Sequence, residues 1–160
     1  MIFVCVGSRG YQFNRLLKAM DELVADGTIK EEVIAQRGLS DYKPVHYAYQ
    51  KYMDVDQFKK MQKDADLIVS HAGTGALVSA LKIGKQVIAV PRRKKYDEHI
   101  DDHQLQVAQA LESQGYLFVV REMDELGSVI KNAKAHPICK KYEIPSNVIQ
   151  IIDDFIQGEI

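Results

Sequence analysis

Hydrophobic and polar residues alternate in blocks along this chain, and the blocks follow two different periods. Short apolar runs rich in β-branched residues are typical of buried strands, and all but one of them are followed by a stretch with apolar residues at helical spacing. The predicted strands are Ile2–Val6, Val33–Ala35, Val45–Tyr49, Leu67–Ser70, Val87–Val90 and Leu117–Val120. The predicted helices are Phe13–Asp26, a segment from Asp54 or Asp56 to Ala65, Ala76–Ile83, Asp102–Gln114, Asp124–Ala135 and Asn147–Gln157.

This alternation of strand and helix indicates an α/β fold, a Rossmann-like parallel sheet with helices on both faces. Continuous apolar runs such as Ile2–Val6 are expected for strands that are covered on both sides. The helix boundaries carry capping residues, which are Gly27, Gly84 and Gly115 after helices, and Asp54 or Asp56 and Ser146 before them. No repeat or linker interrupts the pattern, so we interpret residues 1–160 as one domain.

The most unusual sequence follows the predicted strand Leu67–Ser70. There His71-Ala72-Gly73-Thr74-Gly75 leads directly into a helical pattern. Glycine lets a ligand approach the backbone closely, and the free N–H groups and positive dipole end of a helix attract an anion. The pattern predicts a phosphate site, and a nucleotide diphosphate is the simplest ligand for it.

Two further segments are expected to lie beside this turn. Gly7-Ser8-Arg9-Gly10 follows the first predicted strand, and Pro91 opens a basic loop after the strand Val87–Val90. Ligands of parallel sheets bind beyond the carboxyl ends of the strands. The polar and glycine-rich segments therefore predict a single binding rim.

Composition excludes several classes of protein. The net charge of −1 gives no global attraction to nucleic acid or to membranes. Cys5 and Cys139 match no zinc or redox spacing, which suits a reducing cytoplasm. No segment approaches the length of a membrane span, and no secretion signal opens the chain. We therefore expect a soluble cytoplasmic protein.

Four segments carry a family resemblance when they are taken together. They are Ser70-His71-Ala72-Gly73-Thr74-Gly75, Leu81-Lys82-Ile83-Gly84-Lys85, Val90-Pro91-Arg92 and Glu98-His99-Ile100-Asp101-Asp102-His103-Gln104. In this order and at this separation they resemble the C-terminal half of family 28 glycosyltransferases, over most of the chain. The sequence is most similar to short catalytic subunits of bipartite enzymes, namely bacterial capsule and exopolysaccharide β-1,4-galactosyltransferase subunits and the dolichol-pathway UDP-GlcNAc transferase catalytic subunit.

The resemblance implies a fold equivalent to the C-terminal half of a GT-B glycosyltransferase. It also implies a catalytic subunit that transfers galactose or N-acetylglucosamine, with inversion, to a polyprenyl-diphosphate-linked sugar in polysaccharide biosynthesis. UDP-sugar would be the substrate, with no cofactor and no metal. A GT-B enzyme has two halves and this chain has room for one. We therefore expect a membrane-anchored partner subunit to supply the acceptor site and to hold the chain at the inner face of the membrane.

The resemblance assigns roles to individual residues. The residues expected to contact the UDP-sugar are Ser8, Tyr52, Met53, His71, Gly73, Thr74, Gly75, Ser79, Glu98, Asp102, His103 and Gln104. Of these, Gly73, Thr74, Gly75 and Ser8 would hold the diphosphate. His99 is the candidate for the base that takes the acceptor proton. Many relatives carry a ribose-binding glutamate where this chain has Ser79, which forms fewer and weaker hydrogen bonds.

Most of these residues also have a purely structural interpretation. Ser8 could belong to a tight turn, His71 could satisfy backbone groups, and Thr74 could cap its helix. Asp101 and Asp102 could interact with a helix dipole. The carboxylates and histidines near them lack helix-spaced pairs, which argues against a metal site.

The basic segment Arg92-Arg93-Lys94-Lys95 is interpreted as a solvated loop, or else as a phosphate contact or a site of peripheral membrane association.

Two other functions stay open at this point. The protein could be a nucleotide-sugar-binding or regulatory module without transfer activity. It could also be a small nucleotide hydrolase that uses Glu98 or His99.

Overall fold

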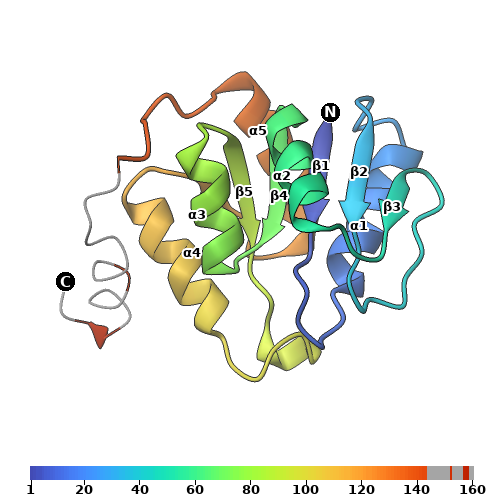
Figure 1. Ribbon diagram of the computed structural model, residues 1–160, viewed down its shortest axis with the longest axis horizontal. Coiled ribbons are helices and arrows are strands. Elements are labelled where there is room, and N and C mark those ends of the chain that lie inside the picture. The colour runs from blue at the N-terminus through green and yellow to red at the C-terminus, as the bar shows by residue number, and fades with distance from the viewer. Residues whose placement is uncertain (144–151, 153–156, 159–160) are drawn as a thin grey trace.

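The computed structural model describes residues 1–143, 152, 157 and 158. Residues 1–143 contain a six-stranded sheet in the order β3-β2-β1-β4-β5-β6, and all neighbouring strands are parallel (Figure 1). The strands are β1 Ile2–Cys5, β2 Val33–Gln36, β3 Ala48–Gln50, β4 Leu67–His71, β5 Gln86–Val90 and β6 Phe118–Val119. The predicted fold class is confirmed.

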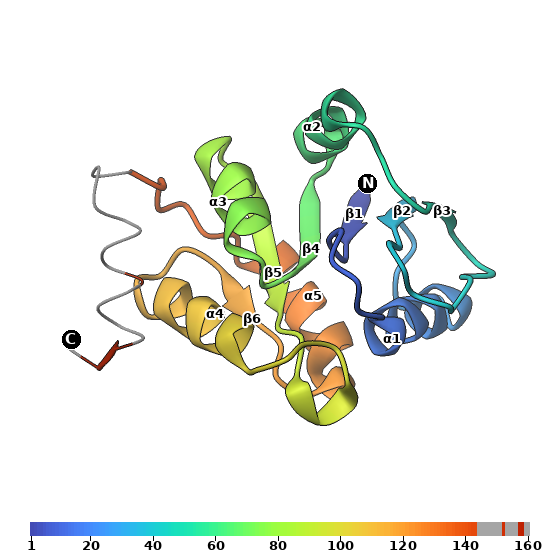
Figure 2. The same ribbon diagram turned by 60° about the horizontal axis from the view of Figure 1, so that its bottom comes forward.

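Helices cover both faces of the sheet (Figure 2). They are α1 Asn14–Ala25, α2 Val55–Asp64, α3 Thr74–Lys82, α4 His103–Ser113 and α5 Leu126–Ala135, with 3-10 turns η1 Lys94–Tyr96 and η2 Met123–Glu125. Helices α1 and α5 pack on one face, and α2, α3 and α4 pack on the other. The predicted helix Asn147–Gln157 and its cap Ser146 lie outside the described residues, apart from isolated positions.

The strand β1 shows why the apolar runs are continuous. Ile2 and Val4 pack into the core formed with α1 and α5, whereas Phe3 and Cys5 pack into the core formed with α3 and α4. Side chains alternate between the two faces of a strand, so a strand with two covered faces is apolar at every position. The centre of the molecule is therefore a strand that belongs to two cores at once.

The predicted strand Val45–Tyr49 is displaced toward β3, Ala48–Gln50. The backbone N–H groups of Val45 and His46 donate to the carboxylate of Asp21 on α1, at 2.9 and 2.8 Å. These donors are therefore not available for pairing with β2. Val45 is 79% exposed, which no central strand residue would be.

The starts of α2 and α3 both bear on the site. Of the two predicted caps of α2, Asp54 is confirmed, because its side chain accepts from the backbone N–H of Gln57 at 2.8 Å in a capping box. Helix α3 begins at Thr74, two residues before the predicted start, and its N-cap is Gly73. Thr74 thus lies in the first turn of α3, so its interpretation as the helix cap is wrong.

The sheet topology also indicates where a ligand would bind. The chain moves outward from β1 through β2 to β3, then returns to β4 on the other side of β1. In parallel α/β sheets, ligands bind at such a reversal, outside the carboxyl ends of the strands.

Within the described residues, no helix has both the length and the apolar character needed to cross a membrane.

Candidate functional site

A cavity of about 730 Å³ lies at this reversal of strand order. It is lined by residues at the carboxyl ends of β1, β2, β4 and β5 and by the first turn of α3. The predicted site residues among its lining are Ser8, Met53, His71, Gly73, Thr74, Gly75, Ser79, His99, His103 and Gln104. The structure therefore brings together segments that are far apart in the sequence.

The first turn of α3 opens toward this cavity. The first backbone bond of the helix runs from the N–H of Leu77 to the carbonyl of Gly73, at 3.0 Å. The earlier N–H groups of a helix have no intrahelical partner, and no side chain among the described residues caps α3. A Cβ atom added at Gly75 would meet no atom within 4 Å, so this flank of the helix is open. The turn has the free donors and the space that an anion needs.

The imidazole of His71 lies between the two glycine turns. Its Nδ1 is 3.2 Å from the carbonyl oxygen of Cys5, which can only accept, so Nδ1 carries the proton. A Cβ atom added at Gly7 would lie 2.6 Å from Nε2, and one at Gly73 would lie closer still. Both positions need glycine because the ring occupies the space of their side chains.

His71 is neutral at pH 7. Burial lowers its pKa to about 4, and the positive charge of Arg92 acts in the same direction, although the hydrogen bond to Cys5 opposes it. His71 therefore both satisfies a backbone carbonyl and lines the cavity. The two interpretations offered by the sequence are compatible.

The segment between β5 and α4 forms another wall. His99 is 8% exposed and stacks on the ring of Tyr11, with centroids 5.7 Å apart. Its Nδ1 lies 3.0 Å from a carboxylate oxygen of Asp101 and 3.4 Å from the backbone nitrogen of Asp101. The carboxylate can only accept, so the closer contact puts the proton on Nδ1 and leaves Nε2 as the basic nitrogen.

Two other side chains of this wall are held at the start of α4. Gln104 is buried, and its side-chain oxygen accepts from the backbone N–H of Arg92 at 3.1 Å. Its amide nitrogen is the group left for a ligand. Asp101 accepts at 3.0 Å from the backbone N–H of His103, the first residue of α4, which agrees with its interpretation as a residue that interacts with the helix dipole.

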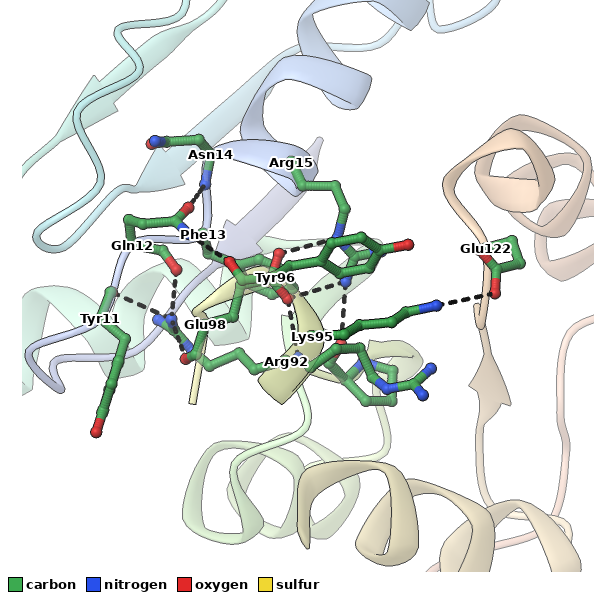
Figure 3. A network of polar contacts seen from close by, with 12 residues as sticks. Tyr11, Gln12, Phe13, Asn14, Arg15, Arg92, Lys95, Tyr96, Glu98 and Glu122 are labelled. Atoms are coloured by element: carbon green, nitrogen blue, oxygen red, sulfur yellow. Dashed lines mark hydrogen bonds and ion pairs between the residues drawn. The ribbon is translucent and has the colours of Figure 1, made fainter. Parts of the chain in front are cut away.

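Glu98 does not reach the cavity. Its carboxylate is fully buried and accepts from Arg15 of α1 through two bonds, of 2.9 Å from Nε and 3.0 Å from Nη2 (Figure 3). It also accepts from the backbone N–H of Arg93 at 2.9 Å. The expected donor contact is corrected to a structural ion pair, and a carboxylate occupied in this way cannot activate water in a hydrolase.

Two more expected contacts lie outside the cavity lining. Asp102 accepts from the backbone N–H of Lys94 at 3.0 Å and from the side chain of Arg93 at 3.3 Å. Tyr52 is 44% exposed beside the cavity residue Met53. The structure therefore separates these two residues from the ten that it brings together.

The solvated-loop interpretation is wrong for Arg92. This residue is 1% exposed, and its guanidinium donates to backbone carbonyls of Tyr11, Gln12, Glu98 and Val6. The first arginine of the basic segment is thus part of the interior. Its neighbours Lys94 and Lys95 are exposed, as expected.

Sequence reasoning also missed two buried amides at the cavity. Gln36, at the carboxyl end of β2, accepts from the backbone N–H of Met53 at 2.9 Å. Gln62 of α2 donates to the hydroxyl of Ser79 at 3.0 Å. Gln36 could have been found from its position directly after an apolar run, whereas Gln62 has no such signal.

The electrostatics of the cavity favour an anion. Arg9, Lys59 and Arg92 are in its lining, and Asp101 is the one carboxylate among the described residues that line it. No group of three or more His, Cys, Asp or Glu side chains in the described residues is arranged to hold a metal ion.

The sequence model of the glycosyltransferase family 28 C-terminal domain matches residues 1–155. The chain belongs to that family.

Individual relatives of this family 28 domain match over shorter segments. UDP-N-acetylglucosamine transferase subunit ALG13 of Yarrowia lipolytica is 39% identical over 72 residues, which are 45% of this chain and 34% of the relative. The human subunit of the same name is 29% identical over 124 residues, which are 73% of this chain and 11% of the relative.

A third relative comes from Geobacter sulfurreducens. It is the UDP-N-acetylglucosamine--N-acetylmuramyl-(pentapeptide) pyrophosphoryl-undecaprenol N-acetylglucosamine transferase, 34% identical over 105 residues, which are 61% of this chain and 28% of the relative. The matches to these three proteins cover 34%, 11% and 28% of their lengths, so the family 28 domain corresponds to a part of each.

Solved structures agree on the fold. The NMR structure of ALG13 superposes with a TM-score of 0.63 and 17% identity, over 97% of this chain and 96% of that one. Acinetobacter baumannii MurG gives a TM-score of 0.57 and 15% identity, over 96% of this chain and 49% of that one. The family 28 domain therefore has the fold of one half of a GT-B glycosyltransferase.

The depressed pKa of His71 predicts a specific dependence of stability on pH. Its pKa is about 4 in the folded protein and 6.5 when unperturbed, so its contribution to stability is complete above pH 6.5 and falls as the pH drops toward 4. His71→Asn keeps an amide donor for the Cys5 carbonyl but does not titrate. We expect the wild type to lose about 2 kcal/mol relative to this variant between pH 8 and pH 5.

Urea unfolding at the two pH values measures this difference. His136→Asn is the matched control, because it replaces an exposed histidine. Parallel losses of stability in wild type and His71→Asn would contradict the assignment of a neutral, half-buried imidazole.

Proposed function

We propose that this family 28 domain binds a UDP-sugar and is the donor-binding catalytic half of a glycosyltransferase that acts on a lipid-linked sugar. The observation that carries the proposal is the first turn of α3, which no described side chain caps and which opens to a cavity whose charged lining residues are three cations and one carboxylate. The names of the relatives, which are N-acetylglucosamine transferases, support the same chemistry.

In this proposal the two glycine turns bind the diphosphate. The backbone N–H groups of Gly73 and Gly75, the hydroxyl of Thr74 and the side chain of Ser8 donate to it. Negative charge grows on the diphosphate as the sugar leaves, and fixed donors at a helix N-terminus stabilise that charge without a metal. The cavity-lining positions of all four residues support the proposal.

Residues on the other walls of the cavity would bind the uracil, the sugar and the acceptor. The backbone near Met53, tied to Gln36, reads the uracil, and Gln104 and His103 bind hydroxyls of the sugar. His99 accepts the proton of the acceptor hydroxyl through Nε2, and Asp101 stabilises the imidazolium that forms. The contact of 3.0 Å between Asp101 and Nδ1 of His99 supports this pairing.

Donor and acceptor are proposed at a finer level from the relatives. Their names favour N-acetylglucosamine as the sugar, with galactose as the alternative from the resemblance to capsule and exopolysaccharide subunits. The acceptor is a sugar on a polyprenyl diphosphate. A membrane-anchored partner subunit supplies its site, because this domain corresponds to one half of a two-half fold.

The phosphate turn gives the first test of the proposal. Gly75→Val is expected to abolish UDP binding, because the branched side chain would occupy the space of the phosphate, while the fold persists since no atom lies within 4 Å of the new Cβ. Calorimetry with UDP and thermal unfolding measure the two effects. Ala135→Val, an exposed position at the end of α5, is the control. Wild-type UDP affinity in the folded variant would refute the assignment.

The ribose site gives a second test. Ser79 lines the cavity and its hydroxyl is bonded to Gln62 and to the carbonyl of Ala76 at 3.0 Å. Ser79→Glu is expected to tighten UDP by about 1–2 kcal/mol, because a carboxylate can accept from both ribose hydroxyls. Ser79→Gln, of similar size but without charge, is the control. Unchanged or weaker binding in Ser79→Glu would show that other groups hold the ribose.

Transfer itself is expected to need the partner. A lone half binds its donor locally but leaves the acceptor unpositioned and water in contact with the activated sugar. We expect the purified chain to bind UDP-N-acetylglucosamine or UDP-galactose yet to transfer sugar to a diphospholipid acceptor only when membranes from the source cells are added. Radiolabelled donor and extraction of the lipid product measure the transfer.

Each other outcome of that assay has a distinct meaning. Full transfer by the chain alone contradicts the half-enzyme proposal. Donor binding with no turnover in the presence of membranes supports the binding-module alternative. Release of UDP without an acceptor supports the hydrolase alternative.

A further inference from the structure

Arg92 bonds to both ends of the first glycine turn from a position after β5. Its Nη1 donates to the carbonyls of Tyr11 at 3.1 Å and Gln12 at 3.0 Å (Figure 3). Its Nη2 donates to the carbonyl of Val6. A third bond from Nη1, of 3.3 Å, ends on the carbonyl of Glu98. One planar guanidinium therefore fixes the segment from residue 6 to residue 12, which includes Ser8.

No carboxylate in the described part of the chain pairs with this cation. The four bonds of its guanidinium end on carbonyl oxygens, and the nearby carboxylate of Glu98 is bound bidentately by Arg15. Phe13 lies between the two guanidinium groups, 5.0 Å from that of Arg92 and 5.6 Å from that of Arg15. Two cations and one anion leave this buried cluster with an excess of positive charge.

The charge of Arg92 acts on the cavity. Arg92 is in the cavity lining although it is 1% exposed, and it contributes, after burial, to the lowered pKa of His71. Burial lowers the pKa of Arg92 itself to about 10, although the negative charge of nearby Glu98 opposes this shift, so Arg92 stays protonated at pH 7. A buried charge that shares one anion with a second cation is only partly compensated, and an anion in the cavity would offset the remaining cost.

We infer that Arg92 is a positioning residue of the donor site, which holds the first glycine turn in place and supplies the buried positive charge that a bound diphosphate compensates. This inference rests on the proposed function. A residue that only braces the loop would affect every ligand of the cavity alike. A residue that also supplies charge discriminates UDP, which carries the diphosphate, from uridine, which does not.

The test compares the affinities for UDP and uridine by calorimetry, in variants that keep a cooperative thermal unfolding transition. Arg92→Met is expected to weaken UDP about tenfold or more and uridine by less than about threefold, because a buried charge is little screened. Arg92→Lys keeps the charge and is expected to restore most of the preference for UDP. The control is Lys95→Met, an exposed cation of the same segment, which should leave both affinities unchanged.

Glu98→Gln provides the opposite change in charge. It removes the negative charge beside Arg92 while keeping the size of the side chain, so the preference for UDP over uridine should rise. If Arg92→Met does not fold, this variant decides, and a preference at or below that of the wild type overturns the inference. If neither folds, Arg92→Lys decides, and a tenfold loss of the preference overturns it.

The results separate the inference from the proposed function. If the wild type does not bind UDP, the proposed function fails. If the wild type binds UDP and Arg92→Met loses UDP and uridine equally, or neither, the proposed function stands and the charge of Arg92 plays no part in it.

Discussion

The whole site depends on one constraint of the sheet. Strands β1 and β4 are neighbours, but the helices that follow them lie on opposite faces, α1 on one and α3 on the other. The two glycine turns must therefore diverge as they leave the sheet, and a space opens between them. The ring of His71 lies between the two turns, against Gly7 and Gly73, and all three residues line the cavity.

The net charge of the site depends on which polar side chains are buried at the carboxyl edge of the sheet. Arg92 binds carbonyls, His71 is held neutral by burial and nearby cations, and the carboxylate of Glu98 is taken up by Arg15. The carboxylate of Glu98 is therefore paired within the protein, whereas the charge of Arg92 and the free N–H groups of α3 can still act on an anion. The helix dipole of α3 adds to the same sign.

The sequence predicted the fold well because its strands are buried on both faces, so each reads as an uninterrupted apolar run. The glycine turn between β4 and α3 is also visible in the sequence, because it is a local signal, while its use as a phosphate site stays a prediction. It failed where distant contacts decide. Asp21 displaces β3, and Arg15, 83 residues from Glu98, withdraws that carboxylate from the site. For Arg92 the solvated-loop interpretation fails, because four neighbouring basic residues resemble a surface loop while the carbonyls that this side chain binds belong to a distant segment.

Among the described residues no side chain caps α3, and this has a thermodynamic consequence. The first N–H groups of a helix stay unsatisfied until something accepts from them, and a good N-cap is worth about 1 kcal/mol. An anion bound at the first turn of α3 would take the place of a side-chain cap. Affinity for the anion and the stability of that turn would then be coupled, so an anion that binds there would also stabilise the helix.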